Sequence, residues 1–255
     1  MLTDITKDLK KYIPIFQQAQ DQAMNESDTS MRISKFCETV LGYDLFTEIS
    51  REHAVKERKV DYAVKVGEKF YFFIEVKQAG VALKDRHVEQ ASNYAANAGV
   101  NWVLLSNGIQ WNMYHLTFDE GIQIDLAWTV DLLKDDIRDA AAKIGMLHRK
   151  NIVKGPLEEY FTKKNVLSPR SIIQAVFHEN TLHLIRIHLK NASGVTVDED
   201  DVVENIKSMI SKETWEKIGE VKVVRKRKTA PRAKPVASAG STPEREQQKP
   251  EETQS

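Results

Sequence analysis

Cysteine is nearly absent from this sequence, and its scarcity excludes two kinds of structure. Cys37 is the only cysteine among 255 residues, so the chain can form no intramolecular disulfide and no thiolate metal cluster. Long apolar runs are also missing. No stretch approaches the ~18 apolar residues that a membrane span needs, and the first twenty residues lack the apolar core of a signal peptide. These absences predict a soluble protein of the cytoplasm with no membrane partner.

Neither sign of charge is in excess, because 37 basic and 37 acidic side chains cancel. Their distribution is uneven, however: residues 221–255 hold nine basic and four acidic side chains, a net charge of +5. Such an arm can bind a polyanion through its phosphates, although a solvated, disordered end explains the same composition. Beyond Val224 the only large apolar residue is Val236. We therefore expect a disordered basic and polar tail at 221–255.

Hydrophobic periodicity predicts an α/β domain at residues 1–130. The segment MRISKFCETVL has helical spacing, with Gly42 at its end and Ser27, Asp28 or Ser30 as candidate N-caps. Asn107-Gly108 separates two apolar runs and favours a tight hairpin turn with positive φ angles. The expected elements in chain order are a helix at 31–41, strands at 45–49, 60–66 and 70–77, a helix at 86–98, and two strands within 101–116. This order predicts a mixed central sheet flanked by helices.

The pattern becomes helical after Asp131 and predicts a helical extension at 131–220. Apolar residues recur at helical spacing in 132–144 and again in 202–210, the second set following four consecutive acids. The segment TLHLIRIHL between them fits a helix or a strand about equally, and its neighbours favour a helix.

Three polar residues stand out within two strand-like runs: Asp61 in KVDYAVKV, and Glu75 and Lys77 in FIEVK. Side chains alternate along a strand, so Glu75 and Lys77 share a face, and a hairpin through Gly67 can bring Asp61 to the same surface. Two neighbouring carboxylates repel each other unless a cation lies between them. Mg²⁺ suits such oxygens, and a lysine beside it can orient or deprotonate a water that attacks phosphorus. An acid and a lysine on an exposed sheet face also occur as a simple surface pair.

Further motifs make the pattern more specific. Asp61 followed by Glu75-x-Lys77 resembles the D...(D/E)xK signature of the PD-(D/E)xK nuclease superfamily. Together with ETVLGY, VDYAV, FIEVK, EQASNYA and LLSNGIQWNMYHL, it resembles the N-terminal nuclease domain of type I restriction enzyme R subunits over about residues 30–118. The resemblance implies a restriction-endonuclease-like fold and metal-dependent hydrolysis of DNA.

The same resemblance implies roles for individual residues. Asp61 and Glu75 would hold Mg²⁺, for which Mn²⁺ can substitute, with the Val76 carbonyl as a candidate further ligand. Lys77 would serve the attacking water.

Three more residues match family positions. Glu38 matches an acid on the first helix that can aid metal or water positioning. Gln90 and Tyr94 match a Q-x-x-x-Y element, and their i, i+4 spacing puts them on one helix face that could reach the site and the DNA backbone.

One part of the family pattern is missing. Restriction subunits continue into an ATP-driven motor, whereas this sequence has no G-x-x-x-x-G-K-[ST] loop. A partner, either a targeting or a motor protein, or the helical extension would then have to direct the domain to DNA.

Other interpretations are weaker. His178, His183 and His188 are five apart, which spreads them over different helix faces, and Asp198 to Asp201 lacks the glycine and distal glutamate of a calcium loop. The main alternative is a module that keeps the nuclease fold. Such a module either binds nucleic acid or a partner without cleaving, or depends on a partner for activity. The sequence does not decide whether the substrate is DNA or RNA, or whether ends or internal bonds are cleaved. Sequence preference and oligomeric state also stay open.

Overall fold

The computed structural model describes residues 2–55, 58–119 and 121–223 of the chain. They fall into two compact units, which divide between Ile172 and Ile173. Among the described residues, no helix combines the length and apolar character needed to cross a membrane. The predicted tail lies outside the described residues from 224 onward.

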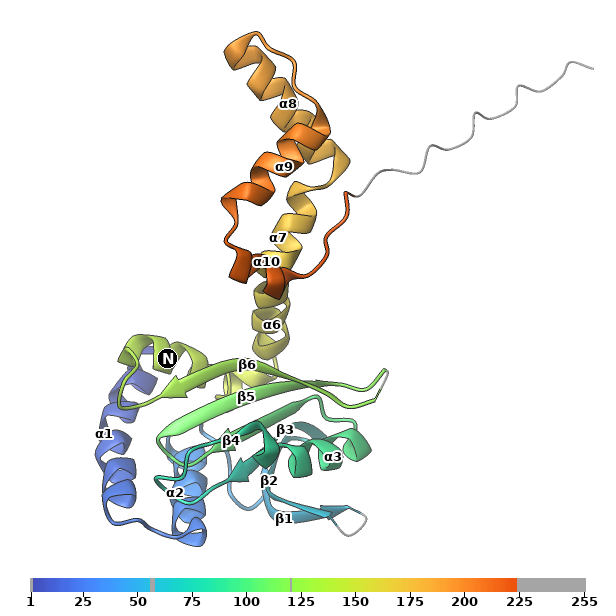
Figure 1. Ribbon diagram of the computed structural model, residues 1–255. Coiled ribbons are helices and arrows are strands. Elements are labelled where there is room, and N and C mark those ends of the chain that lie inside the picture. Colours follow the sequence, from blue (N-terminus) through green and yellow to red (C-terminus); the bar gives the residue numbers. More distant parts are fainter. Residues whose placement is uncertain (1, 56–57, 120, 224–255) are drawn as a thin grey trace, which may run out of the picture. The chain divides into compact units, whose positions relative to one another are not determined.

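A six-stranded sheet forms the centre of the first unit (Figure 1), and its strands lie in chain order. All neighbouring strands are antiparallel except β3 and β4, which are parallel and joined through α3. The sheet is therefore mixed, as predicted. The strands are β1 Ile49–Val55, β2 Arg58–Val66, β3 Lys69–Val76, β4 Trp102–Ser106, β5 Gln110–Thr117 and β6 Gln123–Asp131.

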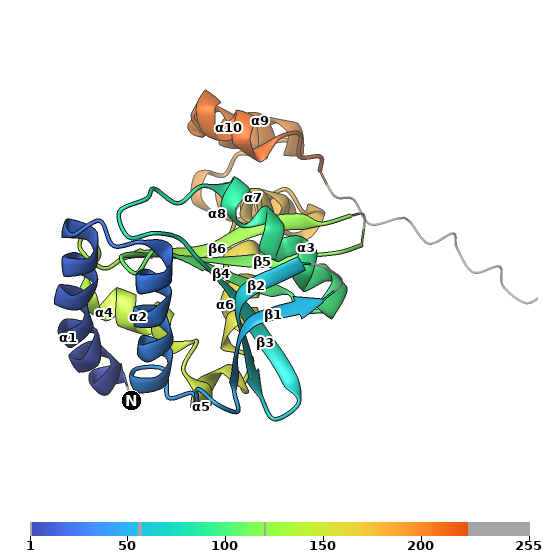
Figure 2. The ribbon, with the colours of Figure 1, turned by 90° about the horizontal axis from the view of Figure 1, so that it is seen from below.

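Helices cover both faces of this sheet (Figure 2), and each face has its own apolar core. One core includes Phe16, Phe36 and Trp111 and receives side chains from α1, α2 and the helices after β6. The other lies under α3 and includes Phe73, Tyr94 and Leu105. The helices of this unit are α1 Leu2–Asp21, α2 Glu26–Thr39, the short 3-10 helix η1 Asp85–His87, α3 Glu89–Ala98, α4 Ile137–Gly145, α5 Arg149–Ile152 and α6 Pro156–Val166.

The restriction-endonuclease-like α/β class predicted from sequence is confirmed, with differences at several elements. The helix expected at 86–98 is divided into η1 and α3. Helix α2 begins at Glu26, not at residue 31, because Asn25 caps it by accepting a hydrogen bond from the Asp28 N–H. Residues 45–48 form a turn, and the strand follows it from Ile49. The Asp44 carboxylate holds this turn by accepting the N–H groups of Phe46 and Thr47.

The hairpin between β4 and β5 is present, but its turn differs from the expected one. Positive φ occurs only at Gly108, at 89°, and not at Asn107. The Asn107 side chain accepts hydrogen bonds from the N–H groups of Ile109 and Gln110 instead. Residues 107–109 thus connect the strands in a longer loop with one positive φ angle, which the Asn107 side chain stabilises.

The second unit is a small helical assembly with its own core. Phe177, Leu182, Val202 and Ile218 are buried there. Its helices are α8 Glu179–Ser193, α9 Glu199–Met209 and α10 Lys212–Ile218, while α7 Pro169–Val176 spans the division between the units. TLHLIRIHL lies within α8, as predicted.

The first unit continues past residue 130, where the sequence predicts the start of a separate extension. Helices α4 to α6 contribute buried residues such as Ile144, Leu147 and Leu157 to the larger core of the sheet domain. The Arg149 Nε donates to both carboxylate oxygens of buried Glu48, at 2.6 and 2.7 Å. These contacts explain why the compact unit extends beyond the last strand of the sheet.

Candidate functional site

The three predicted polar residues meet at one end of the β2–β3 pair. The register pairs Tyr62 with Ile74, and continuing it by one residue places Asp61 opposite Glu75. The Asp61 Oδ2 accepts a hydrogen bond from the Val76 N–H at 2.7 Å. The hairpin therefore holds Asp61 against the segment that carries Glu75 and Lys77.

A buried ion pair occupies the centre of this group. Glu75 is only 6% exposed, and its Oε1 lies 2.6 Å from the Lys77 Nζ. Glu26, from the first turn of α2, approaches the same ammonium at 3.8 Å. The site thus gathers three carboxylates around one lysine, from α2, β2 and the end of β3.

The environment of Glu75 opposes its ionisation. Burial raises the pKa of Glu75 to about 7, the hydrogen bond and charge of Lys77 counteract burial, and the charges of Asp61 and Glu26 add to the rise. A carboxylate in this position gains from any additional cation.

Lys77 is held in its charged form. Burial alone would lower the pKa of Lys77, but the hydrogen bond and charge of Glu75, with the charges of Glu26 and Asp61, outweigh burial and raise it. In this arrangement Lys77 is an ammonium donor and not a free base.

A small depression opens beside Asp61. It measures about 200 Å³ and is lined by Glu26, Ser27, Ser30, Arg51 and Asp61. The N-terminal turns of α2 therefore form one wall of the site.

The other predicted residues lie at different distances from this group. Gln90 and Tyr94 do share α3, which covers the smaller core. Tyr94 is 0% exposed, and its ring packs 4.8 Å from that of Phe73, two residues before Glu75. Gln90 is exposed near the start of the helix. The Tyr94 side chain thus supports the strand that carries Glu75.

Glu38 is not brought to the site. It lies twelve residues after Glu26 on α2, about 18 Å further along the helix at 1.5 Å per residue. Its carboxylate pairs with Lys35 at 2.5 Å. Glu26, which the sequence interpretation missed, is the α2 acid next to Lys77.

The weaker metal hypotheses find no support among the described residues, where no group of three His, Cys, Asp or Glu side chains is placed to hold a metal. Asp198 occupies the N-cap position of α9 without a side-chain capping hydrogen bond, and the acids after it lie in the first turn of that helix. Burial raises the pKa of the Cys37 thiol to about 12, which makes it inert.

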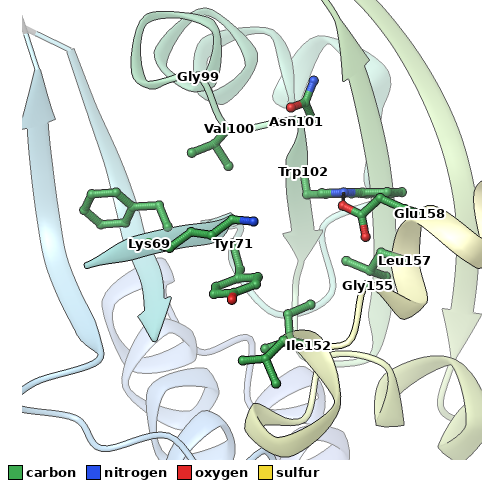
Figure 3. Close-up of a pocket in the computed structure, with 12 residues that line it drawn as sticks. Lys69, Tyr71, Gly99, Val100, Asn101, Trp102, Ile152, Gly155, Leu157 and Glu158 are labelled. Atoms are coloured by element: carbon green, nitrogen blue, oxygen red, sulfur yellow. Dashed lines mark hydrogen bonds between the residues drawn. The ribbon is translucent and has the colours of Figure 1, made fainter. Parts of the chain in front are cut away.

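A second hollow, of about 320 Å³, lies at the opposite ends of β3 and β4 and is bordered by the α5–α6 segment (Figure 3). Lys69, Tyr71 and Trp102 line it, and the Trp102 Nε1 donates to Glu158 at 2.7 Å. None of the predicted site residues borders this hollow.

Two acids and a lysine at one end of adjacent strands, in a mixed sheet with flanking helices, define a restriction-endonuclease-like domain. Residues 41–125 match the family model described as type I restriction enzyme R protein N terminus (HSDR_N). This confirms the resemblance that the motifs indicate at about 30–118 and associates this part of the chain with restriction enzymes. Comparisons with curated proteins and with solved structures gave no match.

Proposed function

We propose that the protein is a Mg²⁺-dependent nuclease that hydrolyses phosphodiester bonds of DNA at the end of the β2–β3 pair. The observation that carries the proposal is the buried Glu75 carboxylate, opposite Asp61 and 2.6 Å from the Lys77 ammonium. Neighbouring acids in a partly buried position are costly unless a cation compensates them.

The residues present fit a magnesium ion. Mg²⁺ binds through one or two carboxylates and completes its shell with waters and substrate phosphates, so Asp61 and Glu75 suffice without a third side-chain ligand. The Val76 carbonyl is a candidate further ligand, because its own N–H already fixes Asp61. When bound, the ion would polarise the phosphate and lower the pKa of a bound water.

The remaining roles would then fall to the side chains of Lys77, Glu26 and Asp61. Lys77, held as an ammonium, would orient the attacking water and offset the negative charge that develops on the phosphate. Glu26 faces the same ammonium at 3.8 Å and would help to fix its direction. Asp61 keeps its position through the Val76 N–H.

Recognition of DNA would need further groups, from the helical extension or from a partner, because this sequence has no G-x-x-x-x-G-K-[ST] loop of an ATP-driven motor. We include in the proposal a role for the basic tail at 221–255 as a sequence-independent anchor. A targeting or motor subunit, as the restriction-enzyme match suggests, would supply direction.

The test is cleavage by the purified protein of supercoiled, linear and single-stranded DNA in Mg²⁺ or Mn²⁺ and in EDTA. We expect metal-dependent cleavage that falls at least a hundredfold in Glu75→Ala and in Lys77→Ala, with DNA binding retained. The matched control is Glu68→Ala, an exposed acid in the turn of the same hairpin, which should cleave at the parental rate.

Cleavage by Glu75→Ala at the parental rate would remove this carboxylate from the mechanism. DNA binding without cleavage by the parental protein in either metal would favour the alternative, a non-catalytic or partner-dependent module with the same fold.

A further inference from the structure

The depression beside Asp61 combines features that suit an anion. Arg51 and Ser27 line it together with the carboxylates of Glu26 and Asp61. Ser27 is the second residue of α2, so its backbone N–H precedes the helix's own hydrogen bonds and lies at the positive end of the helix dipole. A phosphate oxygen is the usual partner of such a combination of donors.

The Arg51 guanidinium contacts an aromatic ring, and no ion pair of Arg51 is found among the residues that the structure describes. Its guanidinium lies over the ring of Tyr62, 5.9 Å from the ring centroid. The Tyr62 hydroxyl donates to the Ser30 carbonyl at 2.9 Å and lies 2.7 Å from the Ser30 hydroxyl. A cation–π contact of this kind helps to orient the guanidinium, whose N–H donors at the edge suit a phosphate.

The position of Arg51 relative to Asp61 and Glu75 determines which phosphate of the DNA strand Arg51 can bind. Arg51 pairs with Tyr62, the residue after Asp61, and β1, β2 and β3 are consecutive in the sheet. The backbone of Arg51 is thus one strand away from that of Asp61 and two strands from that of Glu75, about 5 and 10 Å at the usual strand spacing. The Arg51 and Asp61 side chains both line the depression. A phosphate at the two acids would leave the next phosphate of the same DNA strand near β1.

The charge balance gives a reason for such a contact. Glu26, Asp61 and Glu75 place three acids around one lysine, so a polyanionic DNA strand approaches a negative surface. Arg51 is a cation on the β1 side of the site. Its charge offsets the repulsion between DNA and these acids at a position that a metal ion bound by Asp61 and Glu75 would not reach.

We propose that Arg51 and Ser27 form a subsite for the phosphate adjacent to the one that is cleaved. This inference rests on the proposed nuclease function and deepens it, because it gives the DNA strand a path from β3 across β2 to β1. Arg51 then acts in positioning, through the substrate backbone and not on the reacting atoms.

The first experiment compares Arg51→Gln with the parental protein in cleavage and in binding. KM should rise about tenfold, as for the loss of a hydrogen-bonded charge contact, while kcat stays within about twofold. Binding is measured in the Glu75→Gln background, where the slope of log Kd against log salt should fall by about 0.7–0.9, the value for one phosphate contact. Arg138→Gln, an exposed arginine on α4, is the matched control and should change neither.

The second experiment removes the charge from the DNA. An oligonucleotide with a neutral methylphosphonate next to the cleaved bond, on either side in turn, should lose about tenfold in kcat/KM with the parental protein at one of the two positions. The same substitution should cost Arg51→Gln nothing further, because the two changes remove one interaction.

The outcomes separate the two proposals. An unchanged KM, Kd and salt slope in Arg51→Gln would overturn the subsite, as would a loss confined to kcat. If the parental protein does not cleave but its DNA binding still depends on Arg51 with the lower salt slope, the nuclease proposal fails and the phosphate contact stands.

Discussion

Glu75 is the residue whose ionisation most affects both stability and the proposed chemistry. Its folded-state pKa of about 7 lies above the ordinary value of 4.5 because burial disfavours the charged form. Between these pH values the folded protein binds more protons at Glu75 than the unfolded chain does. The contribution of Glu75 to stability is therefore fully present below about pH 4.5 and is lost as pH rises through about 7.

Glu75→Gln should consequently stabilise the metal-free protein at pH 8 relative to the parental protein, but much less at pH 5. The stabilisation at pH 8 should exceed that at pH 5 by about 2–3 kcal/mol. About two pH units of the rise in pKa from 4.5 to about 7 lie above pH 5, at ~1.36 kcal/mol each. Urea unfolding in EDTA at both pH values measures it. A difference that is equal at both pH values would show that Glu75 is not protonated in the folded state.

At the residue scale, sequence motifs predicted part of the candidate site. Asp61, Glu75 and Lys77 could be found because strand alternation and hairpin pairing fix their positions once the turn at Gly67 is recognised. Glu26 could not be found in this way, because the first turn of α2 has no apolar residue and the periodicity begins only near Ile33. The cap residue Asn25, followed by an acid, was the available signal.

At the element scale, the buried strands could be predicted from the sequence, whereas elements with weak periodicity could not. The apolar runs of β2 to β5 predicted strands, because burial on a sheet face leaves a period in the sequence. Helix α1 and strand β6 were not anticipated: α1 contains Pro14, and the exposed positions of β6 weaken its alternation. Contacts between distant segments, such as that of Gly108 with α1, leave no local pattern.

Gly108 gives an element-scale prediction, because it combines a positive φ of 89° with a close approach to Phe16 of α1. A Cβ built on Gly108 would lie 2.5 Å from the Phe16 Cδ1. Gly108→Ala should therefore lower the free energy of unfolding by about 2–4 kcal/mol, from backbone strain together with overpacking. Chemical denaturation measures this loss.

Gly67→Ala is the matched control, since Gly67 also has a positive φ, 61°, but nothing lies within 4 Å of its added Cβ. Its cost should be about 1–2 kcal/mol, from backbone strain alone. Equal losses in the two variants would mean that Phe16 moves aside without cost.

At the scale of the whole molecule, the first unit depends on residues well beyond its last strand. The segment from residue 131 to 172 supplies Ala141, Ile144 and Leu157 to the larger core, and Arg149 pairs with the buried Glu48. The Tyr43 hydroxyl also donates to the Leu147 carbonyl at 2.7 Å. A domain cut at residue 130 would expose this core and leave Glu48 without its cation.

We therefore expect a fragment of residues 1–172 to unfold in one cooperative transition and a fragment of residues 1–130 to lack one. Every residue of the proposed site lies within the longer fragment, so it should retain metal-dependent cleavage if the nuclease proposal holds. Arg149→Ala within the longer fragment tests the link directly. Loss of the cation that pairs with buried Glu48 should cost about 2–4 kcal/mol, somewhat less than the ~3–5 kcal/mol of a fully buried pair, because the Arg149 side chain is exposed. Thermal denaturation followed by circular dichroism distinguishes these cases, and a cooperative 1–130 fragment of equal stability would place the domain boundary at the end of the sheet instead.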